Sequence, residues 1–307
     1  MNRAISAAGA RPACVTERLR EIGPRWQRDI RVAGDDTKAL YLPLLRAASR
    51  EGSSVLRDLP YGPSPRQVLD IHRPAGANRA PVIVFVHGGA FVRGDKTIND
   101  QMYGNVLTWF AERGCIGVNV EYRLAPEAPY PGGSFDLGLA CRWLEQHVAE
   151  FGGDPSRVCL LGHSAGGTHV ASLLCDPRPE LAALSPGVAC AVLVSARLKA
   201  DVLPVNPNAS GVRAYYGDDA AAYEACSPMA HASRIRQPVF VANAQFENPL
   251  LDLYGLEFAW ALGRARGTAP LHVTLADHNH VSMMAHFNSG EHWLGEQILD
   301  FFESACR

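Results

Sequence analysis

Short apolar runs alternate with segments of helical spacing along most of this chain. The runs are rich in β-branched side chains and predict strands, whereas apolar residues three or four positions apart predict amphipathic helices. The strands are expected at 68–72, 81–86, 116–120, 158–161, 189–194, 238–242 and 271–275, and the helices at 98–113, 135–150, 165–174, 253–265 and 291–304. This alternation predicts an α/β fold with a mostly parallel central sheet flanked by helices.

Ligands bind such sheets outside the carboxyl ends of the strands, so functional residues are expected directly after strands. Two segments fall outside the alternation. Residues 15–50 have a loose helical pattern, and residues 201–235 are long and poorly periodic. A loop-rich insertion of the second kind often shapes a pocket.

Composition excludes several functional classes. The chain has 307 residues, of which 47% are hydrophobic and 20% charged, and its formal net charge is −2. These are ordinary globular values, with neither the basic footprint of a nucleic-acid-binding protein nor a polybasic lipid-binding segment. No apolar run approaches the length of a membrane span. We expect no nucleic acid and no membrane among the partners, and a homodimer is compatible with this composition.

The cysteines and the N-terminal residues indicate the cellular compartment of the protein. The eight cysteines form no CxxC pair, and several lie inside apolar runs, as small buried side chains do. The first residues lack the apolar run that a secretory signal needs. A cytoplasmic location is the resulting expectation.

A nucleophile is indicated at Ser164. The stretch Gly162-His163-Ser164-Ala165-Gly166 matches G-x-S-x-G and lies between a predicted strand and a predicted helix. In that context a sharp turn holds the serine in a strained backbone and exposes its hydroxyl. An ordinary helix-capping turn is the alternative.

Backbone donors are indicated after an earlier strand. His87-Gly88-Gly89 follows residues 81–86, and glycines at a strand end leave bare amides free to bind a substrate oxygen. We assign an oxyanion hole to the amides of Gly88, Gly89 and Ala165. His87 is expected to orient the loop rather than to act as a base.

Together these segments resemble the esterase and lipase branch of the α/β hydrolases that carries an HGG oxyanion motif. The matching stretches are HGGAFVRGDK (87–96), EYRLAPEAPYP (121–131), DPSRVCLLGHSAGG (154–167) and NHVS (279–282). The YRLAPE stretch is similar to the hormone-sensitive-lipase group, and the GHSAGG form to the carboxylesterase and kynurenine-formamidase-like branch. The resemblance implies a helical cap formed by residues 1–60, over a core of residues 61–307 in which about 201–235 form a cap or pocket insertion.

The resemblance and the chain order together select a base and an acid. A serine needs a base, and in this fold the order is Ser, then Asp or Glu, then His. His280 follows the last predicted strand and matches the closing motif, with His278 as the alternative. Glu247 stands where the family usually has Asp, with Asp252 as the alternative. A metal at His278 and His280 would lack an evident third ligand.

The expected reaction is hydrolysis of small soluble esters through an acyl-enzyme, without metal or organic cofactor. Phe91, Tyr215 and Tyr216 are predicted to contact the substrate, and core packing is the alternative for them. An arylformamidase-type amide hydrolase and a non-catalytic relative that binds a small ligand are the other hypotheses. A peptidase is disfavoured, because no large extra domain is evident.

Overall fold

A computed structural model describes residues 11–48 and 52–307 of the protein. Its centre is an eight-stranded sheet with the strand order β1-β2-β4-β3-β5-β6-β7-β8. Strands β3 to β8 run parallel to one another, and β2 is antiparallel to both β1 and β4. The strands are β1 (Ser53–Pro60), β2 (Val68–Pro74), β3 (Ala80–Val86), β4 (Ile116–Val120), β5 (Gly153–His163), β6 (Val188–Val194), β7 (Val239–Phe246) and β8 (Leu271–Asn279).

The sheet contains one strand that the sequence pattern did not predict. Strand β1 lies at the sheet edge, where all its positions are intermediate or exposed, and its residues form no apolar run. Residues 53–60 therefore belong to the sheet, and the predicted extension of the helical cap to residue 60 is wrong. The other seven strands occur where the apolar runs predicted them.

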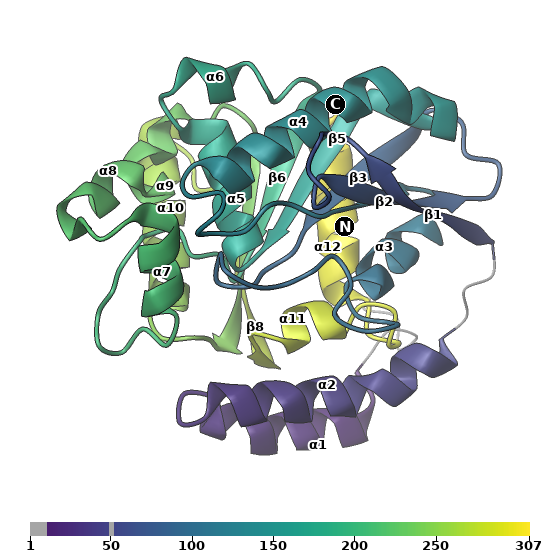
Figure 1. Ribbon diagram of the computed structural model, residues 1–307. Helices are drawn as coiled ribbons and strands as arrows, with labels where there is room; N and C mark the ends of the chain where they lie inside the picture. Colours follow the sequence, from purple (N-terminus) through teal and green to yellow (C-terminus); the bar gives the residue numbers. More distant parts are fainter. Residues whose placement is uncertain (1–10, 49–51) are drawn as a thin grey trace.

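Helices cover both faces of the sheet (Figure 1). Helices α4 (Gly132–His147), α5 (Ala165–Cys175) and α10 (Leu251–Arg266) share one apolar cluster with it. Helices α3 (Gly104–Ala111) and α12 (Trp293–Ala305) share the other. The two clusters are separate because side chains of each buried strand alternate between the two faces.

Two helices at the N-terminus form a hairpin outside these layers. Helix α1 (Ala13–Ile22) is joined through the 3-10 turn η1 (Gly23–Arg25) to α2 (Ile30–Ala47), whose first turn is capped by Asp29. The hairpin lies beside β8 and α11 (Ser282–Ala285), across one edge of the sheet (Figure 1). Within the described residues, no helix is both long and apolar enough to cross a membrane.

The poorly periodic segment 201–235 contains only short helices. They are α7 (Ala209–Tyr216), η3 (Ala220–Ala222), α8 (Tyr223–Cys226), α9 (Pro228–His231) and η4 (Ala232–Arg234). Three further short elements lie elsewhere: η2 (Val148–Phe151), α6 (Pro179–Ala182) and α11. Helices of one or two turns are too short to display a 3.6-residue period, which explains why the sequence pattern was weak here.

Strand order decides which loops meet. The chain moves outward from β3 to β4 and then returns to β5, so β3 and β5 are neighbours although β4 lies between them in sequence. Val86 pairs with Gly162 in the register of these two strands. The loop after β3 and the turn after β5 therefore leave the sheet side by side, at a point where crevices form in open α/β sheets.

The close approach of these two segments leads to a stability prediction. A Cβ atom on Gly166 would lie 2.1 Å from the Val86 carbonyl oxygen and 2.5 Å from that of His87. Because backbone atoms cannot move aside like a flexible side chain, we expect Gly166→Ala to lower the free energy of unfolding by about 1–3 kcal/mol. Urea denaturation measures this change. Gly104→Ala is the control, since its Cβ would meet only His72 at 3.7 Å; equal stability of the two variants would contradict the prediction.

Candidate active site

Four loops that follow strands converge at the carboxyl edge of the sheet. The loop after β3 and the turn after β5 are adjacent, and so are the loops after β7 and β8, where Phe246 pairs with Asn279. The predicted nucleophile Ser164, the predicted base His280 and the glycines Gly88 and Gly89 line one cleft of about 700 Å³ at this edge. The sheet thus brings together residues that are far apart in sequence.

Ser164 occupies a strained turn. Its φ is 55° and its ψ is −120°, a backbone conformation that residues with a Cβ atom adopt at a cost. The amide of Ser164 donates to the Val194 carbonyl oxygen at 3.0 Å, and helix α5 begins at the next residue. The partly exposed side chain therefore stands at the amino end of a helix, where the helix dipole favours developing negative charge.

Glycines make room for this turn. A Cβ atom on Gly162 would lie 2.6 Å from the Gly166 carbonyl oxygen, and one on Gly88 would lie 2.8 Å from the Ser164 Cβ. Contacts this short do not occur between real Cβ atoms and their neighbours. The turn around Ser164, called the elbow below, can approach the loop after β3 only because Gly162 and Gly88 have no side chain.

His280 and Glu247 form a hydrogen-bonded pair. His280 Nδ1 lies 2.7 Å from Glu247 Oε2 and donates to it, and Glu247 Oε1 accepts from the Ala244 amide at 2.8 Å. Glu247 is 2% exposed and His280 is 7% exposed. The carboxylate thereby fixes the tautomer of the ring and leaves Nε2 free for a second partner.

Neither alternative residue occupies an equivalent place. Asp252 is exposed in the first turn of α10. His278 is fully buried between Ser282 Oγ, 2.9 Å from its Nδ1, and Glu291 Oε1, 2.9 Å from its Nε2. Both ring nitrogens of His278 are therefore occupied, and it does not line the cleft.

No hydrogen bond joins the Ser164 hydroxyl to the His280 ring, both of which are described by the structure. The two side chains nevertheless border the same cleft. Catalytic hydrogen bonds are often long or poorly aligned before substrate binds, so this geometry is compatible with proton transfer between them.

The loop after β3 lines the cleft with Gly88, Gly89 and Ala90. Gly89 has a φ of 148°, and Ala90 and Phe91 follow with φ of 51° and 71°. Among the described residues, the amides of Gly88 and Gly89 donate to no backbone carbonyl. The Ala165 amide, at the first position of α5, is likewise without a backbone acceptor in this part of the chain. Because no backbone carbonyl accepts from them, these three N–H groups remain the predicted donors to an oxyanion.

Tyr103 is a cleft residue that the sequence pattern did not single out. Its hydroxyl interacts with the Gly88 amide. Burial raises the pKa of Tyr103 to about 12, against a smaller lowering by that amide, so the hydroxyl is neutral at physiological pH. Its φ of 71° is unusual for an aromatic residue.

His87 supports the loop, as the sequence predicted. Its ring is stacked on Tyr122 with centroids 4.4 Å apart, and Nε2 lies 3.0 Å from Glu121 Oε1. Its Nδ1 lies 2.7 Å from the Gly88 carbonyl oxygen. The ring is fully buried and does not line the cleft, so it orients Gly88 from behind.

His163, at the first variable position of the G-x-S-x-G motif, contacts the loop that carries His280. Its Nε2 donates to the His280 carbonyl oxygen at 3.0 Å, and the two rings are 4.8 Å apart. Burial lowers the pKa of His163 well below its usual range, and the nearby His280 lowers it further. A neutral His163 therefore links the elbow directly to the loop that carries His280.

The three aromatic residues predicted to contact the substrate do not line the cleft. Phe91 stacks on Tyr215 with centroids 4.6 Å apart and an interplanar angle of 3°, and Tyr216 meets Phe91 edge-on at 5.7 Å. None of the three lines the cleft that contains Ser164. The alternative, core packing, describes their placement: they form an apolar cluster behind the loop after β3.

The N-terminal hairpin holds both loops of the acid–base pair. Trp26 Nε1 donates to Asn248 Oδ1 at 3.1 Å, next to Glu247, and Asn279 Nδ2 donates to Thr37 Oγ1 at 2.9 Å, next to His280. All four side chains are buried. Sequence reasoning missed these contacts, because they join positions more than 200 residues apart that no local pattern relates.

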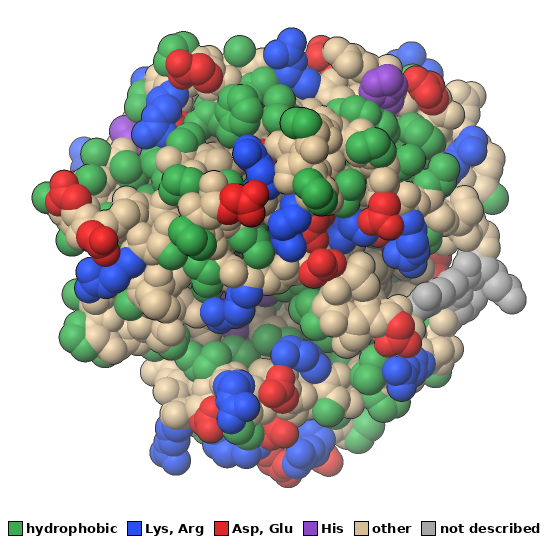
Figure 2. Space-filling model, in the orientation of Figure 1, with side chains coloured by type: hydrophobic (Ala, Val, Ile, Leu, Met, Phe, Trp, Pro, Cys, Tyr) green, Lys and Arg blue, Asp and Glu red, His purple; other side chains and the backbone are tan. Residues whose placement is uncertain are grey.

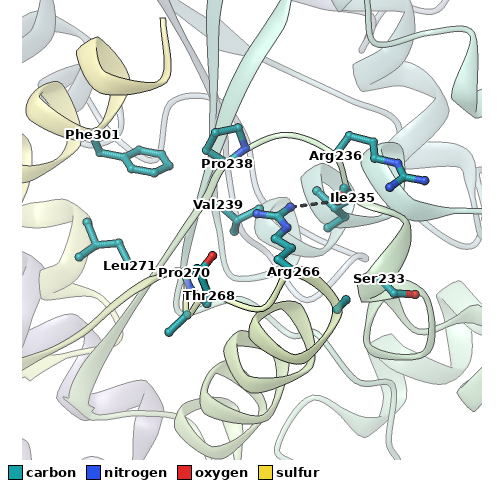
Figure 3. Close-up of a pocket in the computed structure, with 12 residues that line it drawn as sticks. Ser233, Ile235, Arg236, Pro238, Val239, Arg266, Thr268, Pro270, Leu271 and Phe301 are labelled. Carbon is teal, nitrogen blue, oxygen red and sulfur yellow. Dashed lines mark hydrogen bonds between the residues drawn. The ribbon is translucent and has the colours of Figure 1, made fainter. Parts of the chain in front are cut away.

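A second cavity is unrelated to this site. It has a volume of about 410 Å³ and lies at the opposite edge of the sheet, near the first residues of β7 and β8 (Figure 3). Arg266 crosses it and donates to the Ile235 and Gln237 carbonyl oxygens at 2.9 and 2.6 Å. These bonds tie α10 to the loop before β7, which gives Arg266 a structural role.

Several known proteins are similar to this chain. Esterase LipQ of Mycobacterium tuberculosis is 27% identical over 263 residues, which are 80% of this chain and 62% of LipQ. Carboxylesterase NlhH of the same organism is 38% identical over 130 residues, which are 41% of this chain and 37% of NlhH. The chain thus spans less than two thirds of the length of these relatives.

Solved structures share the fold along nearly the whole chain. A bacterial heroin esterase superposes with a TM-score of 0.68 at 24% identity, covering 92% of this chain and 93% of that protein. Esterase B from Lactobacillus rhamnosis superposes with a TM-score of 0.69 at 19% identity, covering 96% and 97%. These matches establish the α/β-hydrolase fold.

Two family models match the sequence. One, named BD-FAE, matches residues 69–178, which include the HGG loop and the elbow. The other, the prolyl oligopeptidase family, matches residues 139–307, which include Ser164, Glu247 and His280 and make up more than half of the chain. The chain therefore belongs to the prolyl oligopeptidase family, on the α/β-hydrolase fold.

Proposed function

We propose that this protein is a serine carboxylesterase that hydrolyses small esters through an acyl-enzyme. The observation that carries the proposal is the Glu247–His280 hydrogen bond of 2.7 Å, beside a cleft that Ser164 also lines. A buried carboxylate that orients an imidazole toward a serine on a strained elbow is the arrangement that activates a hydroxyl for attack on a carbonyl.

The reaction proceeds in two halves. Ser164 attacks the ester carbonyl while His280 Nε2 takes its proton, and the oxyanion accepts hydrogen bonds from the amides of Gly88, Gly89 and Ala165. His280 then gives the proton to the leaving alkoxide. Water attacks the acyl-enzyme in the same way, and the acid and the free serine are released. Glu247 accepts the hydrogen bond from Nδ1 of His280 and thereby stabilises the imidazolium.

The cleft size and the relatives support small esters as substrates. A volume of about 700 Å³ is within the range of small-molecule sites. The similar proteins LipQ and NlhH are named as an esterase and a carboxylesterase. The family also bears the name of a peptidase, so peptide bonds are the competing substrate class.

The cysteines support a cytoplasmic location, which we infer with the function. All eight are free thiols. A reducing compartment preserves such thiols, whereas secreted proteins commonly pair them.

The activity is tested with purified protein and three substrate types. We expect hydrolysis of p-nitrophenyl butyrate, and slower or no hydrolysis of N-formylkynurenine and of a peptidyl p-nitroanilide. Faster turnover of N-formylkynurenine would favour an arylformamidase, and faster turnover of the anilide would favour a peptidase. Binding of a small ligand without turnover of any of the three would favour a non-catalytic relative.

Replacement of the nucleophile gives the first activity prediction. Ser164→Ala is expected to lower kcat on p-nitrophenyl butyrate by about 10⁶-fold, because no other group can form the acyl-enzyme. Circular dichroism and thermal unfolding serve as controls for the fold. Turnover near the wild-type value in well-folded Ser164→Ala would refute the proposal.

The acid is tested by two matched carboxylate-to-amide substitutions. Glu247→Gln removes the charge beside His280 and is expected to lower kcat by about 10⁴-fold, as loss of a triad carboxylate does. Asp252→Asn changes an exposed residue of α10 and is expected to leave kcat near the wild-type value. The reverse order of the two effects would assign the acid to Asp252.

A further inference from the structure

The cleft that contains Ser164 carries an excess of positive charge. The whole chain has a formal net charge of −2, so cationic character is not a general property of its surface. Four cationic side chains nevertheless line this cleft, against two carboxylates. The cations are Arg28, Arg31, Lys38 and Arg93, and the carboxylates are Asp29 and Asp35.

Both carboxylates are already engaged. Asp29 Oδ1 accepts from the Val32 amide at 3.1 Å and so caps α2. Asp35 Oδ1 lies 2.8 Å from Lys38 Nζ, whose hydrogen bond lowers the pKa of Asp35, with a smaller contribution from Arg31. Each carboxylate thus already has another partner and does not form an ion pair with an arginine of the cleft.

Within the described part of the chain, three guanidinium groups of the cleft have no ion pair. No carboxylate of residues 11–48 or 52–307 lies within 4.0 Å of Arg28, Arg31 or Arg93. Arg93 Nη2 donates to Asn208 Oδ1 at 3.0 Å, which fixes its side chain against the segment before α7. A guanidinium has five donors, so Arg93 keeps donors for a ligand after making this bond.

The arginines come from opposite walls of the cleft. Arg28 and Arg31 flank the beginning of α2 in the N-terminal hairpin, whereas Arg93 belongs to the loop after β3 that carries Gly88 and Gly89. In Figure 2, Lys and Arg side chains border the hollow between the hairpin and the core on both sides. A ligand that enters this hollow passes between positive groups before it reaches Ser164.

We propose that the physiological substrate is an ester that carries a carboxylate, held at the cleft mouth by Arg28, Arg31 and Arg93. A planar guanidinium matches a carboxylate with two parallel hydrogen bonds. A cleft lined with one sign of charge also raises the association rate of oppositely charged ligands by about 10–10³-fold, and salt weakens this effect. The inference rests on the proposed esterase activity and specifies its substrate class.

The test compares esters that differ in charge but hardly in shape. On the alcohol side, 4-acetoxybenzoate is compared with 4-acetoxybenzamide, and on the acyl side, mono-4-nitrophenyl adipate is compared with its terminal amide. We expect kcat/KM to favour the carboxylate by about tenfold or more in at least one pair at low salt. The pair that shows the preference identifies which half of the ester faces the arginines.

Salt and substitution identify the cause. The preference should shrink between about 0.01 M and about 1 M NaCl, as the Debye length falls from about 30 Å to about 3 Å. The double variant Arg28→Gln/Arg31→Gln should lower the ratio of kcat/KM for the anionic ester to that for its amide toward one. Arg142→Gln, at an exposed position of α4 away from the cleft, should leave this ratio unchanged.

The outcomes separate this inference from the proposed function. Equal or faster turnover of the neutral amides at low salt would overturn the substrate class while leaving the esterase intact. A preference that persists in the double variant or in high salt would also overturn it, because the arginines would not be its source. If none of the four esters is hydrolysed faster by the wild type than by Ser164→Ala, the esterase proposal itself fails.

Discussion

The site depends on one close approach of backbone, between the turn after β5 and the loop after β3. Ser164 can adopt its positive φ, and its neighbours can pass the Val86 and His87 carbonyl groups, only because Gly162, Gly166 and Gly88 lack side chains. This contact sets the Ser164 hydroxyl beside amides that, among the described residues, donate to no backbone carbonyl. The parallel pairing of β3 with β5 makes it possible, since it brings both segments out of the sheet at the same level.

The acid–base pair also depends on two neighbouring parallel strands, but it needs support from elsewhere. Strands β7 and β8 bring Glu247 and His280 to adjacent loops. Each loop then shares a buried hydrogen bond with the hairpin: Trp26 donates to Asn248, and Asn279 donates to Thr37. Buried polar groups that are fully hydrogen-bonded make their surroundings rigid. The hairpin therefore helps to hold the His280 imidazole in place, and it also lines the cleft.

Much of the fold could be predicted from the sequence, because buried parallel strands are apolar runs. The candidate catalytic residues could be predicted too, because they come directly after such runs. The elbow, the HGG loop and the last histidine were all recognisable in this way. Edge strand β1 was not, since half-exposed residues carry no apolar signal. The packing of Phe91 and Tyr215 could not be predicted, because an aromatic side chain near a site can pack behind a loop as easily as line a cleft, and only the tertiary structure decides which.

The ties between the hairpin and the two loops limit how a substrate can reach Ser164. If the hairpin moved away, the Trp26–Asn248 and Asn279–Thr37 hydrogen bonds would break and the buried indole of Trp26 would be exposed to water, which costs free energy. A hinge motion of the hairpin would therefore disturb the loops that carry Glu247 and His280. The cleft between the hairpin and the core is therefore the less costly route to Ser164. With the hairpin in place, the width and the lining of this cleft decide which molecules reach the serine.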